Sequence, residues 1–583
     1  MQLKAVRWPG CFYAIVFALF LGLSLRQLID HDVWFQLVAG RETFERMAVP
    51  KAEFYIYSAL GEPSIFVGWL WGLLLYLAWL CGGYSAVSVF GALVWAAVFT
   101  IAAKAILAGN GHELPDGDAL YRKTQAAAVL IATSVAYQYL AGRAVFRAEA
   151  SLYLAWVLAV CLSAGIADDR QRRRRFLIAV PLLSWMLGWL HTTSIFMLLL
   201  LFAHLLQACV DAGKAPGAGG LRRFVKTDLR AWLAAMLAAA VLPCLNPNGV
   251  EQALPLITAL AQTLYSVVYG QHGTIAGPVV HVNLEYRRLV DVPSVWPVAV
   301  LFLAASLVVV WQDRSRRVVN ALLLTVGMLL SLFHIRALAV WAIFLMIPLG
   351  IAISPFMQKA AAALDSSRRG ALLGGLIAMC CFWNIGTVFN KVGIRWGAGY
   401  RPSPMEQQLL QTLKARVPGG GNIFNWHPLG AYLRWNLGSG YFVAMDGHLA
   451  NDASAAWKAY FDIEDREDRG LSLIDQWRIQ AVYHPVVVPG YGDIHWLGRA
   501  LAYNANWRLA DMDQTGVLFV RTGEGDVDGR TRELLKLEYW RRVIAEAKFV
   551  EMVSGQPDRR DRARRSADYA QEKIGEIQAL LKQ

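Results

Sequence analysis

Two aspartates flank a histidine directly after the first apolar stretch of the chain, in the sequence Asp30-His31-Asp32. Ionised carboxylates are costly in the hydrocarbon of a membrane. If the preceding stretch is a membrane helix, both side chains must lie at the water surface or in a wet cavity. A carboxylate placed there can remove a proton from an attacking hydroxyl or amine. We therefore take Asp30 and Asp32 as the candidate catalytic residues.

The composition is typical of a polytopic membrane protein. Of the 583 residues, 56% are hydrophobic and 17% are charged, and the mean hydropathy is +0.38. The formal net charge of +13 is typical of cytoplasmic loops that face anionic headgroups, so we expect no nucleic-acid partner. All seven cysteines lie in or beside apolar stretches, which predicts no disulfide framework.

Twelve apolar stretches are long enough to cross a membrane or to lie along it: 11–29, 66–82, 85–108, 122–142, 150–167, 177–190, 192–210, 230–245, 295–311, 318–333, 337–355 and 371–388. Basic loops mark the cytoplasmic side. If 66–82 lies in the outer interface and does not cross, all the basic loops, including the strongest at 170–175, fall on the cytoplasmic side. The tryptophans of 66–82 suit such an interfacial position. We therefore expect about eleven crossings, with the N-terminus inside and the C-terminal part outside. The alternative is that another early stretch fails to cross.

This topology places the unusual polar residues on the outer side. Arg147 and His191 each lie between two spans, Glu285 lies in the loop 246–294, and Arg336 precedes a late span. Arginines bind phosphate through paired N–H donors, so such a cavity would suit a lipid-linked anionic substrate. The aromatic segment 54–79, which includes Trp69, could receive a prenyl chain or a sugar. Each polar residue also has a purely structural explanation, as an interface anchor, a turn residue or an ion-pair partner.

The composition changes after residue 390. Short apolar segments at 422–425, 441–445, 481–483 and 516–520 predict strands, and 404–415 and 466–477 predict helices. We therefore expect three domains: a transmembrane domain at 1–390, a periplasmic α/β domain at 391–525 and a helical hairpin at 526–583. The charged hairpin could bind a protein partner, although a solvated appendage is the simpler interpretation.

Several motifs occur together in the order and spacing of one membrane-protein superfamily. They are Asp30-His31-Asp32-Val33-Trp34 with Gly40-Arg41, the segment 49–58, Gly68-Trp69-Leu70, Trp189-Leu190-His191, Leu245-Asn246-Pro247-Asn248-Gly249, Arg336, Phe424-Asn425-Trp426-His427 and Met445-Asp446-Gly447-His448. Through about Arg521 the chain resembles a bacterial branch of the GT-C glycosyltransferases. These multi-spanning proteins are distantly similar to protein O-mannosyltransferases and aminoarabinose transferases.

The resemblance implies a GT-C fold, a polyprenyl-phosphate sugar donor and a first-loop aspartate as base, carried over to Asp30 or Asp32. The sequence departs from the branch at three positions. Glu53 stands where the branch usually has Asp, Gly68 replaces an acidic residue, and Thr192 replaces the Gly after His191. One carboxylate pair is a poor cage for Mg²⁺ or Mn²⁺ without further oxygen ligands. We therefore expect no firm cofactor, and a divalent cation only where other ligands complete the site.

We expect an inner-membrane glycosyltransferase that moves a hexosyl or pentosyl group from a polyprenyl-phosphate carrier to a periplasmic glycan, lipid or protein acceptor. Asp30 and Asp32 would act as base and orienting group, and the expected substrate-binding residues are Arg147, His191, Glu285, Arg336, Glu53 and Trp69.

Two other classes of protein fit parts of the sequence. The missing acidic residue at Gly68 would also suit a non-catalytic GT-C-like scaffold that recruits partners through its periplasmic domain. A lipid or solute transporter fits less well, because such proteins carry charged residues at mid-membrane depth and the spans contain few of them.

Overall fold

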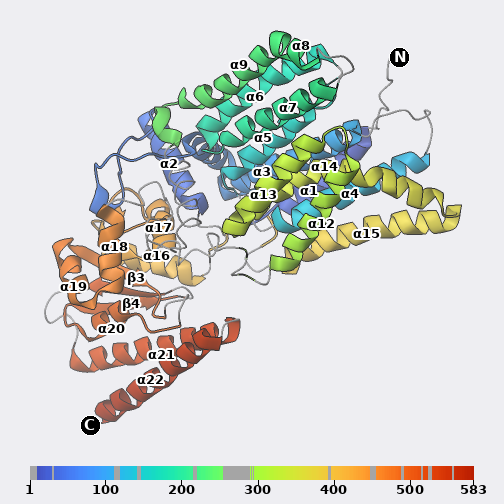
Figure 1. Cartoon of the computed structure of the whole chain (residues 1–583). Helices are drawn as coiled ribbons and strands as arrows, with labels where there is room; N and C mark the ends of the chain where they lie inside the picture. Colours follow the sequence, from blue (N-terminus) through green and yellow to red (C-terminus); the bar gives the residue numbers. More distant parts are fainter. Residues whose placement is uncertain are drawn as a thin grey trace. The chain divides into compact units, whose positions relative to one another are not determined.

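The computed structural model describes residues 10–28, 32–109, 119–140, 146–167, 169–214, 220–253, 289, 292, 295–390, 395–402, 404–446, 455–487, 492–513, 516–522, 528–554 and 557–582. The chain divides into two compact units (Figure 1). The first unit comprises Met1–Val49 and Phe66–Tyr400, and the second comprises Pro50–Ile65 and Arg401–Gln583. The segment Pro50–Ile65 therefore belongs to the second unit, although in sequence it lies well inside the range 1–390.

The first unit is a bundle of helices, and each expected apolar stretch contributes most of its described residues to one of them. Its helices are α1 (Gly10–Ser24), α2 (Asp32–Arg46), α3 (Trp69–Gly109), α4 (Ala119–Leu140), α5 (Glu149–Leu162), α6 (Arg170–Leu190), α7 (Ile195–Lys214), α8 (Gly220–Thr227), α9 (Leu229–Val241), α12 (Trp296–Gln312), α13 (Arg317–Phe333), α14 (Leu338–Ala362) and α15 (Ser366–Asn390), with the short 3₁₀ turns η2 (Leu242–Cys244), η3 (Gly249–Ala253) and η7 (Ile335–Ala337). Helix α14 packs against α3, α4, α5, α12, α13 and α15.

The stretches 66–82 and 85–108 form one 41-residue helix, α3, with a break at Gly82 and Gly83. Gly83 has a φ of +61°, which an L side chain rarely adopts, so the helical path is interrupted between the two stretches. Within the described residues, four helices are long and apolar enough to cross a membrane: α3, α7, α15 and the segment Ile335–Ala362. The pair α8 and α9, bent by 49°, can count as a fifth. The expectation of eleven crossings stays a prediction.

Close packing between helices holds α1, α2, α3 and α4 together. The rings of Phe20 on α1 and Phe99 on α3 stack with centroids 4.0 Å apart, and Tyr137 on α4 contacts both edge-on. Helices α2 and α3 meet through Gly40 and Gly72, where an added Cβ on Gly40 would lie 2.1 Å from the Gly72 carbonyl oxygen. Such small residues let helix backbones approach closely, which is a main source of helix association in membranes. This contact fixes the direction of α2, the helix that begins at Asp32.

The second unit is built on a five-stranded mixed sheet. Its strands are β1 (Gly421–Asn425), β2 (Tyr441–Val443), β3 (Ile479–His484), β4 (Trp507–Met512) and β5 (Val517–Arg521), in the order β2-β1-β3-β5-β4. Strand β1 is parallel to β2 and β3, whereas β5 is antiparallel to β3 and β4. Four of these strands were expected from the sequence; β4 was not. The helices are α16 (Pro404–Arg416), α17 (Gly430–Leu437), α18 (Ala455–Asp465), α19 (Glu467–Gln476) and α20 (Trp496–Tyr503).

The segment 50–65 joins this sheet at its β2 edge. Val443 N–H donates to the Tyr55 carbonyl at 2.9 Å, and Ile56 pairs with Val443 in parallel. The Tyr55 hydroxyl donates to Asp446, and both side chains are buried. Three contacts from one short segment therefore tie the loop after α2 to the sheet unit.

The tail forms two long helices that pack side by side, α21 (Gly529–Val553) and α22 (Pro557–Lys582) (Figure 1). Both helices are attached to the rest of the second unit. Trp540 on α21 donates its indole N–H to the Tyr503 hydroxyl at 3.1 Å, and Ser566 on α22 donates to the Gly492 carbonyl at 2.9 Å. The predicted helical hairpin is thus packed on the sheet unit.

Candidate active site in the helical unit

Asp32 is the first residue of α2, where the positive end of the helix dipole stabilises a carboxylate. Its Oδ2 lies 3.1 Å from Nη2 of Arg147, a residue that is more than one hundred positions away in the sequence. The Asp32 side chain is 33% exposed and the Arg147 side chain 19%. The pair is therefore close enough to interact strongly and open enough to be reached by a solute.

A second ion pair lies next to the first along the chain. Glu149, the first residue of α5, accepts a hydrogen bond from Arg336 Nε at 2.8 Å, and the Arg336 Nη2 contacts the same carboxylate oxygen. The Glu149 side chain is only 11% exposed, whereas that of Arg336 is 32% exposed. Glu149 was not among the candidate residues expected from the sequence, and its pairing with Arg336 depends on the packing of two distant segments.

The two ion pairs share the segment 147–149, and a neighbouring helix contacts the backbone just before each of the two arginines. Trp71 on α3 donates its indole N–H to the Phe146 carbonyl at 2.7 Å, just before Arg147. Tyr139 on α4 donates its hydroxyl to the Ile335 carbonyl at 2.8 Å, just before Arg336. Both arginines are thus positioned by rigid helices. Two carboxylates and two part-exposed guanidinium groups can together hold an anionic group and remove a proton beside it.

Trp69 and His191 lie around a neighbouring turn of the same unit. The Trp69 ring, at the start of α3, contacts the Trp189 ring with centroids 5.4 Å apart. His191 ends α6, and its Nδ1 lies 3.1 Å from the Thr193 hydroxyl. The residue between Trp189 and His191, Leu190, packs against Gly68, the residue before Trp69. Trp69 and His191 are therefore linked through one turn.

Gly68 has a conformation and a setting that exclude an acidic side chain. Its φ is +72°, and an added Cβ would lie 2.9 Å from the Leu190 carbonyl oxygen and 3.3 Å from the Ala148 Cβ. The backbone at position 68 therefore favours glycine over the acidic residue of the resembled pattern. Because Arg147 already neutralises Asp32, the described residues of this site do not form the oxygen-rich cage that Mg²⁺ or Mn²⁺ requires.

The remaining candidates lie elsewhere. Glu53 belongs to the second unit, and its Oε1 accepts hydrogen bonds from the backbone N–H groups of the three following residues at 2.9, 3.0 and 3.2 Å. It therefore holds a turn in the segment 50–65. Asp30 and Glu285 lie outside the described residues.

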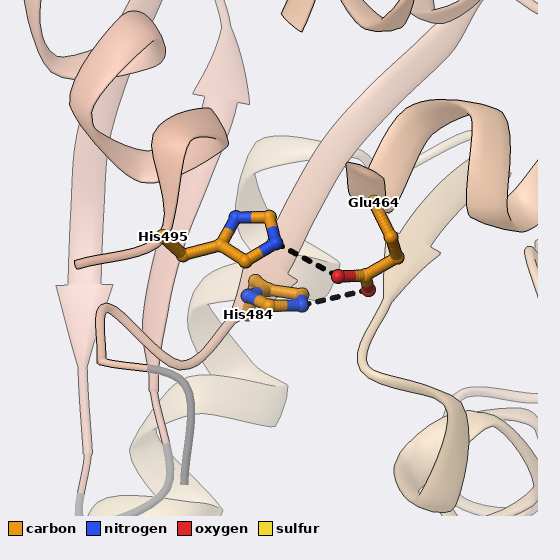
Figure 2. Close-up of side chains that lie close together, drawn as sticks. All are labelled: Glu464, His484 and His495. Carbon is orange, nitrogen blue, oxygen red and sulfur yellow. Dashed lines mark hydrogen bonds and ion pairs between the residues drawn. The ribbon is translucent and has the colours of Figure 1, made fainter. Parts of the chain in front are cut away.

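A further group of ionisable side chains, missed by the sequence analysis, lies in the second unit (Figure 2). Glu464, His484 and His495 bring one carboxylate and two imidazoles together. They are separated by 20 and 11 positions and belong to different elements, so no local motif could have revealed them.

No protein-family model matches the sequence, and no curated protein matches it. The fold does have counterparts among solved structures. The archaeal oligosaccharyltransferase AglB from Archaeoglobus fulgidus, in complex with an inhibitory peptide and a dolichol-phosphate, is 12% identical with a TM-score of 0.51, over 89% of this chain and 74% of that chain. The apo form of the oligosaccharyltransferase from the same organism is 13% identical with a TM-score of 0.52, over 89% and 75%. The chain has a GT-C-like fold.

ArnT from Cupriavidus metallidurans in its apo state is also similar, at 12% identity and a TM-score of 0.48, over 88% of this chain and 97% of that chain. At identities this low, the likeness to the two oligosaccharyltransferase structures shows the fold alone. Any activity of the GT-C-like chain therefore has to be argued from its own residues.

Proposed function

We propose that this GT-C-like chain is an inner-membrane glycosyltransferase that takes a sugar from a polyprenyl-phosphate carrier. The single observation that supports this most strongly is the arrangement of the two ion pairs around the segment 147–149. Arg147 pairs with Asp32, and Arg336 pairs with Glu149, which follows Arg147 by two residues; both carboxylates stand at a helix N-terminus. A dolichol-phosphate, which is a polyprenyl phosphate, is present in one of the structures that share the fold.

Arg147 and Arg336 would bind the carrier phosphate. A guanidinium matches two phosphate oxygens with paired N–H donors, and both arginines keep part of their side chains in contact with solvent. Glu149 would act as a positioning residue, since it holds Arg336 from the buried side. As the sugar–phosphate bond breaks, the leaving phosphate gains negative charge, and the two arginines would stabilise that charge.

Asp32 would act as the general base. In the described structure its carboxylate is paired with Arg147. A phosphate that draws Arg147 to itself would leave the Asp32 carboxylate facing the acceptor. Asp32 would then take the proton from the acceptor hydroxyl or amine while the acceptor oxygen or nitrogen bonds to the anomeric carbon and the phosphate departs with the bonding electron pair. Asp30 is the second candidate for this role.

The acceptor would be a glycan, lipid or protein outside the cytoplasm, and the second unit would lie on the same side. Trp69 would offer an apolar face to the sugar or prenyl chain. His191, at the turn after α6, and Glu285, in the loop 246–294, would also contact the substrate. The described residues near Asp32 do not fit a divalent metal, because its carboxylate is paired with Arg147.

Turnover of a synthetic donor tests this proposal. The purified chain in lipid nanodiscs would be given radiolabelled hexoses and pentoses linked to short polyprenyl phosphates, with release of free sugar or transfer to added lipid acceptors as the readout. We expect turnover with at least one donor, and a loss of about 100-fold or more in the Asp32→Asn variant, the usual contribution of a general base.

Asp169→Asn is the matched control, because Asp169 also stands at the start of a helix, where its side chain caps α6. Asparagine preserves that cap, so its turnover should stay at the wild-type rate. A folded double variant, Asp30→Asn with Asp32→Asn, that keeps full turnover would overturn the proposal.

A further inference from the structure

Glu464, His484 and His495 converge from three elements of the second unit (Figure 2). Glu464 lies on α18, His484 ends β3, and His495 immediately precedes α20. Glu464 Oε1 lies 2.8 Å from His484 Nε2, and Glu464 Oε2 lies 2.8 Å from His495 Nε2. The side chains are 13%, 5% and 5% exposed, respectively. One carboxylate thus faces two imidazoles, one with each oxygen, in a buried place.

The hydrogen bonds on the far side of each ring determine which nitrogen carries a proton. His484 Nδ1 lies 2.8 Å from the Pro485 carbonyl, which can only accept, so Nδ1 is protonated. His495 Nδ1 accepts from the Leu497 backbone N–H at 3.2 Å, so its proton is on Nε2 and is donated to Glu464. His484 Nε2 therefore needs one more proton, or another cation, between itself and the Glu464 carboxylate.

In the metal-free protein a proton fills that place. His484 Nδ1 is already protonated, and its Nε2 lies 2.8 Å from the acceptor Glu464 Oε1, so this contact needs a second proton on the ring. The result is a buried carboxylate–imidazolium pair with a neutral histidine beside it.

Such a pair is an expensive way to join three elements. Desolvation of two buried charges often exceeds their attraction, and well-packed apolar residues would hold α18, β3 and α20 together at least as well. The surroundings are largely aromatic: the Phe424 ring stacks on Tyr460 and on His484, and the Tyr460 hydroxyl donates to the Glu464 oxygen that faces His484. Two imidazoles and a carboxylate at the centre of this apolar setting therefore suggest a ligand that needs those three groups.

We propose that Glu464, His484 and His495 form a binding site for a divalent transition-metal ion of the zinc type. Imidazole nitrogens with a carboxylate suit zinc, whereas magnesium and calcium prefer sites made of oxygen ligands alone. His484 already has the usual orientation of a metal ligand: its Nδ1–H is donated to the Pro485 carbonyl, and its Nε2 is directed to the Glu464 carboxylate, where the ion would bind. The site lies wholly in the second unit and is independent of the proposed transferase site.

The geometry needs only a small adjustment. The three ligand atoms all lie within 4.8 Å of one another. Tetrahedral zinc with bonds of about 2.0–2.2 Å places its ligand atoms roughly 3.3–3.5 Å apart, so the two 2.8 Å contacts must each open by about half an ångström. Side-chain rotation alone can supply that.

Binding also requires two proton movements. The shared proton of His484 and Glu464 leaves, and the proton of His495 moves from Nε2 to Nδ1, so Leu497 N–H loses its acceptor. Losing one helix cap lowers an equilibrium constant about fivefold. A loss of zinc affinity of about fivefold is small, because structural zinc sites bind with nanomolar or lower Kd values. One proton is therefore released for each ion bound.

Metal content and thermal stability of the full-length chain test the proposal. Protein purified without chelator would be desalted, its zinc measured by mass spectrometry, and metal-stripped samples titrated with Zn²⁺ against a chromophoric chelator. We expect about one zinc per chain, a Kd below the micromolar range and a higher Tm with zinc. Millimolar Mg²⁺ or Ca²⁺ should not compete.

His495→Gln is the decisive variant. A glutamine amide can still donate to Glu464, so the fold is preserved, but it is a poor zinc ligand. Zinc affinity should fall at least 100-fold. His334→Gln is the control: His334 lies in the first unit and is not part of the group of three, so its substitution should leave zinc binding unchanged. Wild-type protein that binds no zinc and whose Tm is unaffected by zinc and chelator would overturn the proposal and leave a proton-linked ion pair. Equal affinity of wild type and His495→Gln would also overturn it.

Discussion

The ion pair between Glu149 and Arg336 should stabilise the helical unit by an amount that a double-mutant cycle can measure. Glu149 begins α5, and Arg336 lies in η7 before α14, so the pair joins two helices that are far apart in the sequence. The cycle would use Glu149→Gln, Arg336→Gln and the double variant. Glutamine keeps the shape of Glu149 and removes its charge, whereas at position 336 it shortens the side chain as well as removing the charge; the double variant corrects for that loss of length.

The expected size of the effect follows from burial. Removing one partner of a fully buried pair costs about 3–5 kcal/mol. Glu149 is 11% exposed, but Arg336 is 32% exposed, so water compensates part of the guanidinium charge when its partner is lost. We therefore expect Glu149→Gln to lower the free energy of unfolding by about 1.5–3 kcal/mol, the range for a hydrogen bond to a charged group. The coupling energy should be about 1–2 kcal/mol.

Reversible unfolding in mixed micelles, titrated with a denaturing detergent, would give the four free energies. Arg46→Gln is the control, because Arg46 pairs with Glu42 within one helix and its side chain is 52% exposed. Such a pair is worth less than about 0.5 kcal/mol. If the two single effects at Glu149 and Arg336 add to within about 0.5 kcal/mol, the pair is not coupled and the reasoning is refuted.

Three further predictions concern backbone contacts and the segment 50–65. Gly40→Ala should lower the free energy of unfolding by about 2–3 kcal/mol, because the added Cβ would lie 2.1 Å from the Gly72 carbonyl oxygen and α2 must move away from α3. The same detergent titration measures this free energy. Gly68→Glu, which installs the acidic residue of the resembled pattern, should reduce the yield of folded protein in size-exclusion chromatography rather than create a metal site, because φ is +72° there and a Cβ would lie 2.9 Å from the Leu190 carbonyl oxygen. Asp446→Asn weakens the buried hydrogen bond from Tyr55, so limited proteolysis should cut within 50–65 several times faster than in wild type.

The Gly40 and Asp446 variants each have a control that the same structure supplies. Gly375→Ala in α15 meets no atom within 4 Å and should be neutral or slightly stabilising, since alanine favours helix. Asp493→Asn removes an exposed carboxylate of the second unit, with a 58% exposed side chain, and should leave proteolysis unchanged. A destabilising Gly375→Ala, or equal cleavage of both aspartate variants, would contradict the packing described for these sites.

Much of the helical unit was predictable because long apolar stretches are strong signals. The break between 66–82 and 85–108 was also visible as Gly82-Gly83, although not that one helix would contain both stretches. Strand β4 was missed because Arg508 and Asp511 interrupt its apolar pattern. The place of 50–65 in the second unit depends on pairing with Val443, nearly four hundred residues away, which no local pattern reveals.

The candidate site was predictable only in part. Topology placed Asp32, Arg147 and Arg336 on one side, and the structure pairs Asp32 with Arg147, yet which charges meet depends on the packing of α2, α5 and α14. The group formed by Glu464, His484 and His495 gave no signal, because its members come together only when the sheet folds.

A structure of the chain in nanodiscs with a polyprenyl phosphate tests the central claim most directly. The account predicts density for the phosphate within about 3 Å of the Arg147 guanidinium, with Arg336 next to it and the Asp32 carboxylate released from Arg147 toward the acceptor side. A phosphate bound away from both arginines, with the Asp32–Arg147 pair intact, would contradict it.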